Sequence, residues 1–112
     1  MSNGLARSAA LAVATLLAAC ASYEQPTPYW TIDGAAFQRL VPGKTTTAEV
    51  RRLIGVPETV NRFERKRESV WQYHYLDGGY YVMFAYVHFD LNGVYQYTYR
   101  IPDPDLNGET NY

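Results

Sequence analysis

The first apolar residues with a helical period follow Asp33. Phe37, Leu40 and Val41 stand at positions i, i+3 and i+4, so they share one face of a helix. Asp33 is a suitable N-cap, because its carboxylate can accept a backbone N–H of the first turn. A Pro-Gly pair ends the pattern. We therefore predict a short helix that begins after Asp33.

A second helix is marked at both ends. Thr46 and Glu49 have the spacing of a capping box, in which each side chain satisfies a backbone N–H of the first turn. Gly55 suits the left-handed position after the last turn, and Pro57 prevents the helix from continuing. The apolar face consists of Val50, Leu53 and Ile54. Both helices are too short to be stable alone, so they must pack on another element.

After these helices the apolar pattern changes to the period of β-strands. Residues 69–76 alternate between two faces, a glycine-rich turn follows, and residues 80–89 form a second strand that is apolar on both faces. A turn at residues 90–93 leads to a third strand at 94–101, in which tyrosines alternate with polar residues. This predicts an antiparallel meander of three strands. The segment Val60–Phe63 fits either a fourth strand or a loop.

The expected fold is therefore α+β, with two short helices packed on one face of a three-stranded antiparallel sheet. The chain is long enough for one such domain only, at residues 33–101. Residues 102–112 contain three acids and no apolar period, so we expect a mobile tail. Eleven tyrosines, four phenylalanines and two tryptophans indicate an aromatic core.

The N-terminal segment has the pattern of a secreted lipoprotein. Arg7 precedes an apolar run from Ala9 to Ala19, which resembles a signal peptide and is shorter than the roughly 20 residues that span a bilayer. Leu17-Ala18-Ala19-Cys20 resembles a bacterial lipobox, whose cysteine becomes the acylated first residue. The alternative is a stray thiol after an ordinary cleavage site. We predict a lipoprotein signal peptide at residues 1–19 and a covalent lipid on Cys20, with no other cofactor.

The residues after the lipobox indicate where the lipid would hold the protein. An Asp just after the cysteine commonly signals inner-membrane retention, and Ala21 stands there instead, which resembles the outer-membrane class. Several acyl chains together, at about 0.8 kcal/mol per buried methylene, anchor a protein stably. Residues 20–32 are then a proline-containing tether to the periplasmic face of the outer membrane. Tyr29 and Trp30 fit either packing on the domain or contact with headgroups.

Composition and motifs argue against several kinds of chemistry. After loss of the signal peptide, nine basic and eleven acidic side chains remain, which excludes a generic nucleic-acid-binding protein. Gly43-Lys44-Thr45 lacks the first glycine of a phosphate loop. Ser22 and Ser69 are the only serines left, and His74 and His88 have no third ligand at zinc spacing. We therefore expect neither an enzyme nor a metal site.

Three segments together resemble a known family. They are Gly43–Pro57, Trp71-x-Tyr73 and Val87–Val94, and their order resembles the SmpA/OmlA family of small outer-membrane lipoproteins, which includes BamE. The resemblance covers residues 36–100 and implies two helices on a three-stranded sheet, as also seen in β-lactamase inhibitor repeats. It implies a non-catalytic accessory or scaffold subunit of the outer-membrane β-barrel assembly machinery. The alternative is a freestanding periplasmic inhibitor or stress-response binding module with the same fold.

Two features are candidates for binding. The first is a basic segment made of Arg62, Arg65, Lys66 and Arg67. Near an anionic leaflet each positive residue contributes about 1 kcal/mol, and BamE-like proteins are associated with phosphatidylglycerol, so the resemblance favours anionic phospholipid. The alternative is a solvated loop whose charges Glu64 and Glu68 balance.

The second candidate is the sheet face that the two helices leave uncovered. We place Val87 and Phe89 against the helices, which leaves Tyr80, Phe84 and Tyr86 outward as the predicted partner-binding residues. Exposed aromatic clusters usually mark an interface with another protein. The alternative is that the tether or the tail folds over this face.

Overall fold

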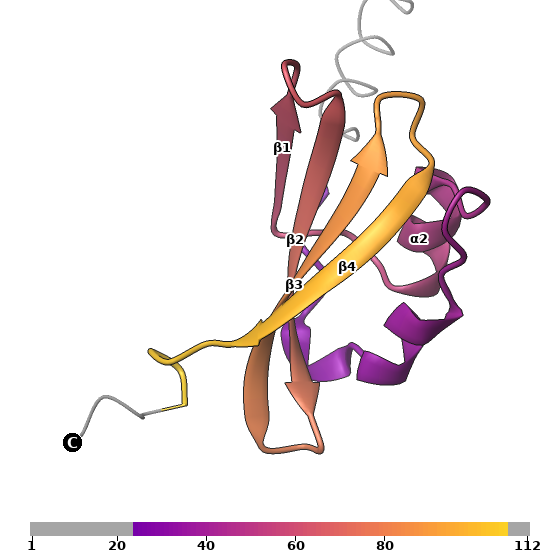
Figure 1. Cartoon of the computed structure of the whole chain (residues 1–112). Coiled ribbons are helices and arrows are strands. Elements are labelled where there is room, and N and C mark those ends of the chain that lie inside the picture. The colour runs from indigo at the N-terminus through magenta and orange to yellow at the C-terminus, as the bar shows by residue number, and fades with distance from the viewer. Residues whose placement is uncertain (1–23, 108–112) are drawn as a thin grey trace, which may run out of the picture.

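Residues 24–107, which a computed structural model describes, form an α+β fold of two layers (Figure 1). The helical layer contains the 3₁₀ helices η1 (Tyr29–Thr31) and η2 (Gly34–Arg39) and the α-helix α2 (Thr47–Leu53). The second layer is an antiparallel sheet of β1 (Thr59–Phe63), β2 (Glu68–Asp77), β3 (Tyr81–Asp90) and β4 (Tyr95–Pro102). The strands neighbour one another in sequence order, so β1 and β4 are the edges. The predicted signal peptide, Cys20 and the last five residues lie outside the described residues.

The sheet has four strands where the sequence pattern predicts three. The additional strand is β1, which pairs with β2 from Thr59 opposite Gln72 to Phe63 opposite Glu68. All five residues of β1 are exposed, so no alternation of apolar and polar residues marks it in the sequence. Its pairing with the ten-residue β2 holds it in place, and Val60–Phe63 is therefore a strand and not a loop.

The first predicted helix is present as the 3₁₀ helix η2. Asp33 is its N-cap as expected, because its carboxylate accepts the backbone N–H of Ala35 at 3.0 Å. Phe37 and Leu40 are buried, but Val41 is 47% exposed and does not belong to the inner face. The backbone is already extended at Leu40, the C-cap. Val41 precedes Pro42, and a residue before proline disfavours the helical conformation, so the helix cannot include Val41.

The second predicted helix is α2, and its N-cap is confirmed. The Thr46 hydroxyl oxygen accepts the backbone N–H of Glu49 at 3.3 Å. The Glu49 carboxylate accepts from the Thr46 hydroxyl and not from a backbone N–H, so the second half of the predicted capping box is not formed. Val50 and Ile54 are buried, whereas Leu53 is 41% exposed, so the inner face is narrower than predicted. Gly55 follows the helix with φ +122°, in the region that favours glycine.

The core lies between the helical layer and one face of the sheet, and its largest side chains are aromatic. Its buried members are Ile32, Ala36, Phe37, Leu40, Val50, Ile54, Trp71, Tyr73, Tyr75, Ala85, Val87, Phe89 and Tyr95. Val87 and Phe89 are fully buried, which confirms the predicted orientation of β3. The Tyr73 hydroxyl donates to the carbonyl oxygen of Gly55 at 2.8 Å and ties the sheet to the end of α2. Burial raises the pKa of this hydroxyl.

The described part of the predicted tether packs on the domain. The backbone N–H of Thr27 donates to the carbonyl of Val56 at 3.0 Å, and the N–H of Val56 donates to the Thr27 hydroxyl at 2.7 Å. Ile32 is buried in the core, and Asp33 forms a parallel bridge with Leu76 beyond the end of β1. Within residues 24–107, no helix is long and apolar enough to cross a membrane.

Candidate functional site

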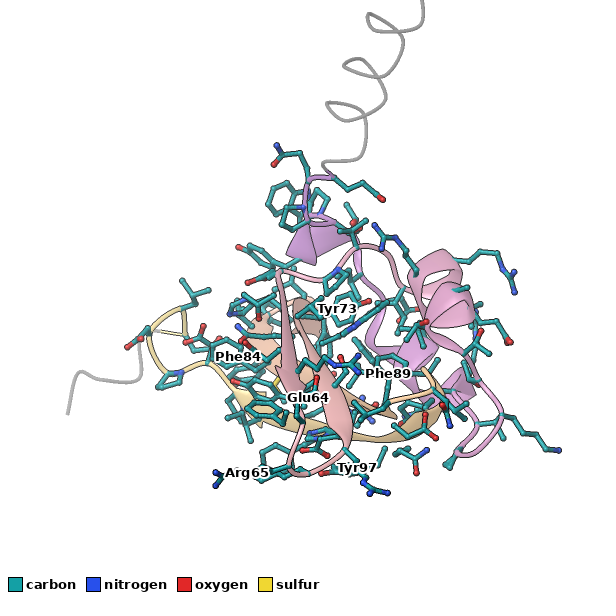
Figure 2. All side chains as sticks on the ribbon, turned by 90° about the horizontal axis from the view of Figure 1, so that it is seen from above. Glu64, Arg65, Tyr73, Phe84, Phe89 and Tyr97 are labelled. Carbon is teal, nitrogen blue, oxygen red and sulfur yellow. The ribbon has the colours of Figure 1, made fainter. Side chains whose placement is uncertain are left out.

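The face of the sheet turned away from the helices, here called the outer face, is rich in aromatic side chains. Its members on the two inner strands are Val70, Gln72, His74 and Leu76 of β2, and Val82, Phe84, Tyr86 and His88 of β3. The edge strands add Phe63, Tyr97, Tyr99 and Ile101. Figure 2 shows Tyr73 and Phe89 pointing toward the helical layer, and Phe84 and Tyr97 pointing away from it. This division follows from the alternation of side chains along each strand.

An open groove of about 420 Å³ occupies the end of the outer face next to the β1–β2 turn. Phe63 and Lys66 contribute from one side, and Tyr97 and Tyr99 of β4 contribute from the opposite edge of the sheet. Between them lie Glu68, Val70, Tyr86 and His88 of the two inner strands. Phe63, Tyr97 and Tyr99 are 44%, 51% and 56% exposed, so the groove presents aromatic surface to solvent.

The basic segment lies in the β1–β2 hairpin, beside this groove. Arg62 forms an exposed ion pair with Glu64, as the balanced-loop interpretation expects. The Lys66 ammonium instead lies 5.9 Å from the centroid of the Phe63 ring, within the range of a cation–π contact. Arg65 lies on the same side of the molecule as Tyr97, at the lower edge of the view in Figure 2. Lys66 is the member of the basic segment that lines the groove, so the two binding features predicted separately, basic and aromatic, meet at this residue.

The structure changes the set of outward aromatic residues. Tyr80 was expected on the strand, but it lies in the β2–β3 turn and is 86% exposed, so it is not part of the outer face. Phe84 is on the outer face, but it is half-buried and does not line the groove. Of the three predicted residues, only Tyr86 lines it.

Tyr97 and Tyr99 were missed because a β-bulge changes the side on which they lie. Strict alternation places Tyr95, Tyr97 and Tyr99 on one face, but the register shifts between His88 and Phe89, so that Phe89 faces Tyr95 and His88 faces Tyr97. Tyr95 is consequently buried in the core, while Tyr97 turns outward. Nothing local in the sequence marks this bulge. Phe63 was missed because the sequence does not distinguish a strand from a loop at Val60–Phe63, so the face on which Phe63 lies cannot be predicted from it.

His88 fixes part of the groove. Its ring stacks on Tyr97 with centroids 4.2 Å apart and an angle of 14° between the planes, and its Nδ1 lies 3.3 Å from the Glu68 carboxylate. Tyr97 is thus held against the sheet although it is half exposed. Among residues 24–107, no group of three or more His, Cys, Asp or Glu side chains is placed to hold a metal ion.

The segment after β4 covers the other end of the outer face. We expected residues 102–112 to be mobile, but residues 103–107 form a turn that is hydrogen-bonded to β3. The backbone N–H of Asp103 donates to the Val82 carbonyl at 2.9 Å, and the Val82 N–H donates to the Asn107 side-chain oxygen at 2.8 Å. Val82 is buried as a result. The tail thus covers this end of the face, as one of the two alternatives expects.

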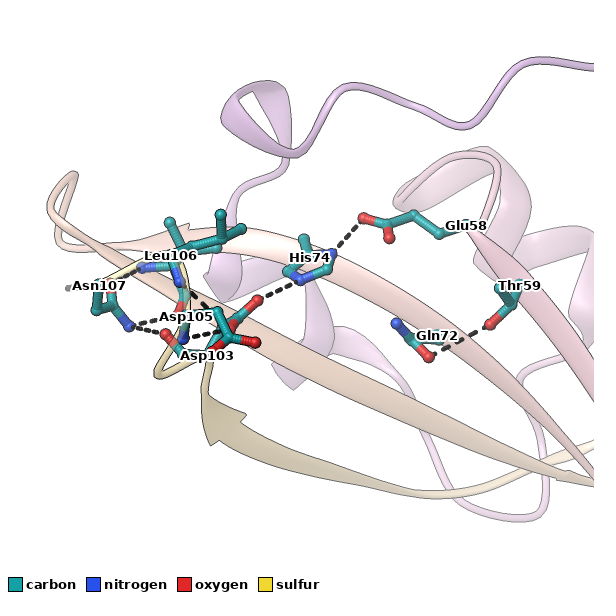
Figure 3. Close-up of polar contacts among 9 residues, drawn as sticks. Glu58, Thr59, Gln72, His74, Asp103, Asp105, Leu106 and Asn107 are labelled. Carbon is teal, nitrogen blue, oxygen red and sulfur yellow. Dashed lines mark hydrogen bonds and ion pairs between the residues drawn. The ribbon is translucent and has the colours of Figure 1, made fainter. Parts of the chain in front are cut away.

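His74 joins this turn to the sheet (Figure 3). Its Nε2 lies 2.9 Å from the Asp103 carboxylate and its Nδ1 lies 2.5 Å from the Glu58 carboxylate. The ring also packs on Phe84, with centroids 4.2 Å apart. Burial of the Asp103 carboxylate acts to raise its pKa, but hydrogen bonds from His74 and from two backbone N–H groups outweigh it and lower the pKa.

The side chains of the groove are of the kinds that bind a partner through non-covalent contacts. It offers aromatic rings, phenol hydroxyls and one ammonium group on the strands and hairpin of the sheet. Such groups provide large contact area at little cost in side-chain entropy. No protein-family model, curated protein or solved structure matches the chain when it is compared with each.

Proposed function

We propose that the protein is a non-catalytic lipoprotein at the periplasmic face of the outer membrane, where it acts by docking a protein partner. The observation that carries this proposal is the groove of the outer face. Tyr97, Tyr99 and Phe63 are half exposed there, next to the basic hairpin. Exposed aromatic clusters of this kind are typical of protein interfaces. Lipid on Cys20 is the proposed anchor.

We further propose that the partner is a subunit of the outer-membrane β-barrel assembly machinery. The resemblance to the SmpA/OmlA family supports this proposal, and so does the packing of the segments that carry it. The backbone N–H of Thr47 donates to the Gly93 carbonyl at 2.9 Å, and that of Tyr95 donates to the Thr45 carbonyl at 2.7 Å. The Gly43–Pro57 and Val87–Val94 segments are thus in direct contact. The fold is, on this proposal, the BamE-like ααβββ arrangement with β1 added at one edge.

The basic hairpin is the proposed contact with anionic phospholipid. Arg62, Arg65, Lys66 and Arg67 are all exposed, and a chain anchored through Cys20 stays close to headgroups. Vesicles that contain phosphatidylglycerol should sediment the protein, whereas pure phosphatidylcholine vesicles should not. Replacement of Arg65 and Lys66 by Gln should weaken sedimentation, and a double change of Arg51 and Arg52 on α2 serves as the control of equal charge. Equal loss in both variants would show that only net charge matters.

Co-purification tests the docking proposal. A mild-detergent pull-down of the native protein should recover barrel-assembly subunits, and the double variant Tyr97→Ser, Tyr99→Ser should lose them. Tyr80→Ser is the matched control, because Tyr80 is more exposed than either tyrosine but lies outside the groove. Recovery of a hydrolase or of peptidoglycan in place of these subunits would favour the freestanding inhibitor or stress-response module. A preparation without any of them contradicts docking.

The anchor has its own test. Radiolabelled palmitate should label the wild-type chain and should not label the Cys20→Ser variant. An unmodified thiol at position 20 in the mature protein would rule out the lipid anchor.

A further inference from the structure

Most of the free hydrogen-bonding groups of the groove can donate a proton. Within residues 24–107, the tyrosine hydroxyls that form hydrogen bonds are those of Tyr73 and Tyr95, so the hydroxyls of Tyr86, Tyr97 and Tyr99 in the groove are free, and the Lys66 ammonium lies over the Phe63 ring. The one carboxylate of the groove belongs to Glu68, which is engaged by His88 at 3.3 Å. A ligand with flat apolar surface and hydrogen-bond acceptors therefore suits this groove.

The spacing of the rings suits an extended polypeptide. Tyr97 and Tyr99 lie on the same face of β4 two residues apart, which corresponds to about 6.6 Å along a strand. A polyproline II helix is also an extended chain, with an advance of about 3.1 Å per residue, and its carbonyls have no internal partners. Proline also lacks an N–H, so each proline of such a segment presents a carbonyl acceptor and an apolar ring but no backbone donor. Aromatic-lined grooves are a common way of binding such segments.

The charges beside the groove indicate which residues accompany the prolines. Within residues 24–107, Glu64 is paired with Arg62, and Glu68 with His88. The hairpin also carries Arg65, Lys66 and Arg67, all three exposed, and none of them takes part in an ion pair with another described residue. The groove consequently has a net positive rim at its hairpin end.

We infer that the groove binds an extended, proline-rich segment that carries acidic residues, and that the docked protein partner contributes it. This inference rests on the proposed docking function and names the chemistry that the site recognises. The prolines stack on Tyr97 and Tyr99, and the phenol hydroxyls donate to the carbonyls of the segment. The acidic side chains face Lys66, the member of the basic hairpin that lines the groove, which leaves Arg65 and Arg67 for the proposed phospholipid contact.

Peptide binding to the full chain in detergent micelles tests this inference. The probe is a fluorescent peptide of alternating Asp and Pro-Pro units, whose binding is followed by anisotropy. Two peptides of equal length serve as controls, one with Ala in place of each Pro and one with Lys in place of each Asp. We expect the probe to bind at least about tenfold more tightly than either control. The Ala peptide loses the proline rings that stack on the tyrosines, and the Lys peptide loses the negative charges that face the basic rim.

Variants of the groove separate specific from general binding. Tyr99→Ala should weaken binding of the probe about 30-fold, the effect of an aromatic hot spot. Tyr99→Phe, which keeps the ring and loses only the hydroxyl, should weaken it about fivefold. Tyr80→Ala should leave it unchanged. Circular dichroism of each variant confirms that the sheet is intact.

Four results would overturn the inference. The first two are binding of the probe no tighter than that of either control peptide, and binding that Tyr99→Ala does not weaken. The other two are absence of peptide binding, either together with subunit recovery in the pull-down or together with Tyr99-dependent binding of phosphatidylglycerol vesicles. The last result would make the groove a lipid site. Recovery of barrel-assembly subunits in the pull-down without any peptide binding overturns this inference and leaves the docking proposal intact.

Discussion

The Nε2 atom of His74 lies 2.9 Å from the Asp103 carboxylate and thereby joins an inner strand of the sheet to the segment that follows the last strand. The same ring faces the Glu58 carboxylate through Nδ1, so three separate parts of the chain meet at one side chain. Because both partners are acceptors, the ring donates to both of them only when both its nitrogens carry a proton. The bridge holds the turn of residues 103–107 over one end of the outer face.

The bridge predicts a dependence of stability on pH. The pKa of Asp103 is lower in the folded protein than its ordinary value, so ionisation of Asp103 stabilises the fold above the unfolded-state pKa of about 3.9. This contribution is lost as the pH falls through the lowered folded-state value. The free energy of unfolding should therefore fall below about pH 4, and it should fall less steeply in Asp103→Asn.

Urea titrations at several acidic pH values measure this dependence, and amide exchange locates it. In Asp103→Asn the Val82 amide, which donates to Asn107, should exchange faster than in the wild type, while the amides of the β1–β2 pair should not change. An identical pH dependence in the two proteins would show that Asp103 does not hold the turn.

Because Phe89 belongs to the aromatic core, we expect truncation of its side chain to destabilise the fold strongly. This side chain is fully buried and packs on Trp71, with ring centroids 4.9 Å apart. Phe89→Ala should lower the free energy of unfolding by about 3–5 kcal/mol, because it leaves a cavity. Phe63→Ala is the matched control on the outer face, where the ring is 44% exposed, and it should cost less than about 1 kcal/mol. Similar costs in urea denaturation would mean that the two faces are assigned incorrectly.

Packing of the N-terminal segment requires that position 55 has no side chain, because Thr27 lies very close to Gly55. A Cβ at this position would lie 2.3 Å from the Thr27 hydroxyl oxygen, and the backbone has φ +122°. Gly55→Ala should therefore displace Thr27 and break its two hydrogen bonds with Val56. Gly78→Ala is the control, because Gly78 also has positive φ but no atom within 4 Å of the added Cβ.

The control variant Gly78→Ala should lower the free energy of unfolding by about 1–2 kcal/mol, from backbone strain alone. Gly55→Ala should lower the free energy of unfolding by more than this amount. It should also accelerate hydrogen exchange of the Val56 amide, whereas Gly78→Ala should leave that exchange unchanged. Unchanged exchange at Val56 would show that Thr27 does not depend on the glycine.

The sequence predicted elements whose signals are local. The start of α2 follows from Thr46, which accepts the Glu49 N–H within one turn of helix, and its end follows from Gly55 and Pro57. The division of β3 into two faces was predicted for Val87 and Phe89 because a strand alternates regularly unless a bulge interrupts it. These features need no knowledge of the distant parts of the chain.

The parts that were missed depend on distant partners. The bulge that separates Tyr95 from Tyr97 arises from the register with β3, and β1 is held only by pairing with β2. The turn after β4 is fixed by hydrogen bonds to Val82, which precedes it by more than 20 residues. The sequence therefore predicted that the site combines an aromatic face with a basic segment. Which residues line the groove became clear only from the pairing of the strands.

Crosslinking in intact cells tests the central proposal, that a partner docks in the groove of the outer face. A photoreactive p-benzoylphenylalanine replaces Tyr97 in one strain and Tyr80 in another, and the crosslinked products are identified by mass spectrometry. Docking predicts a crosslink to a barrel-assembly subunit from position 97 and none from position 80. No protein crosslink from position 97, or the same products from both positions, would contradict it.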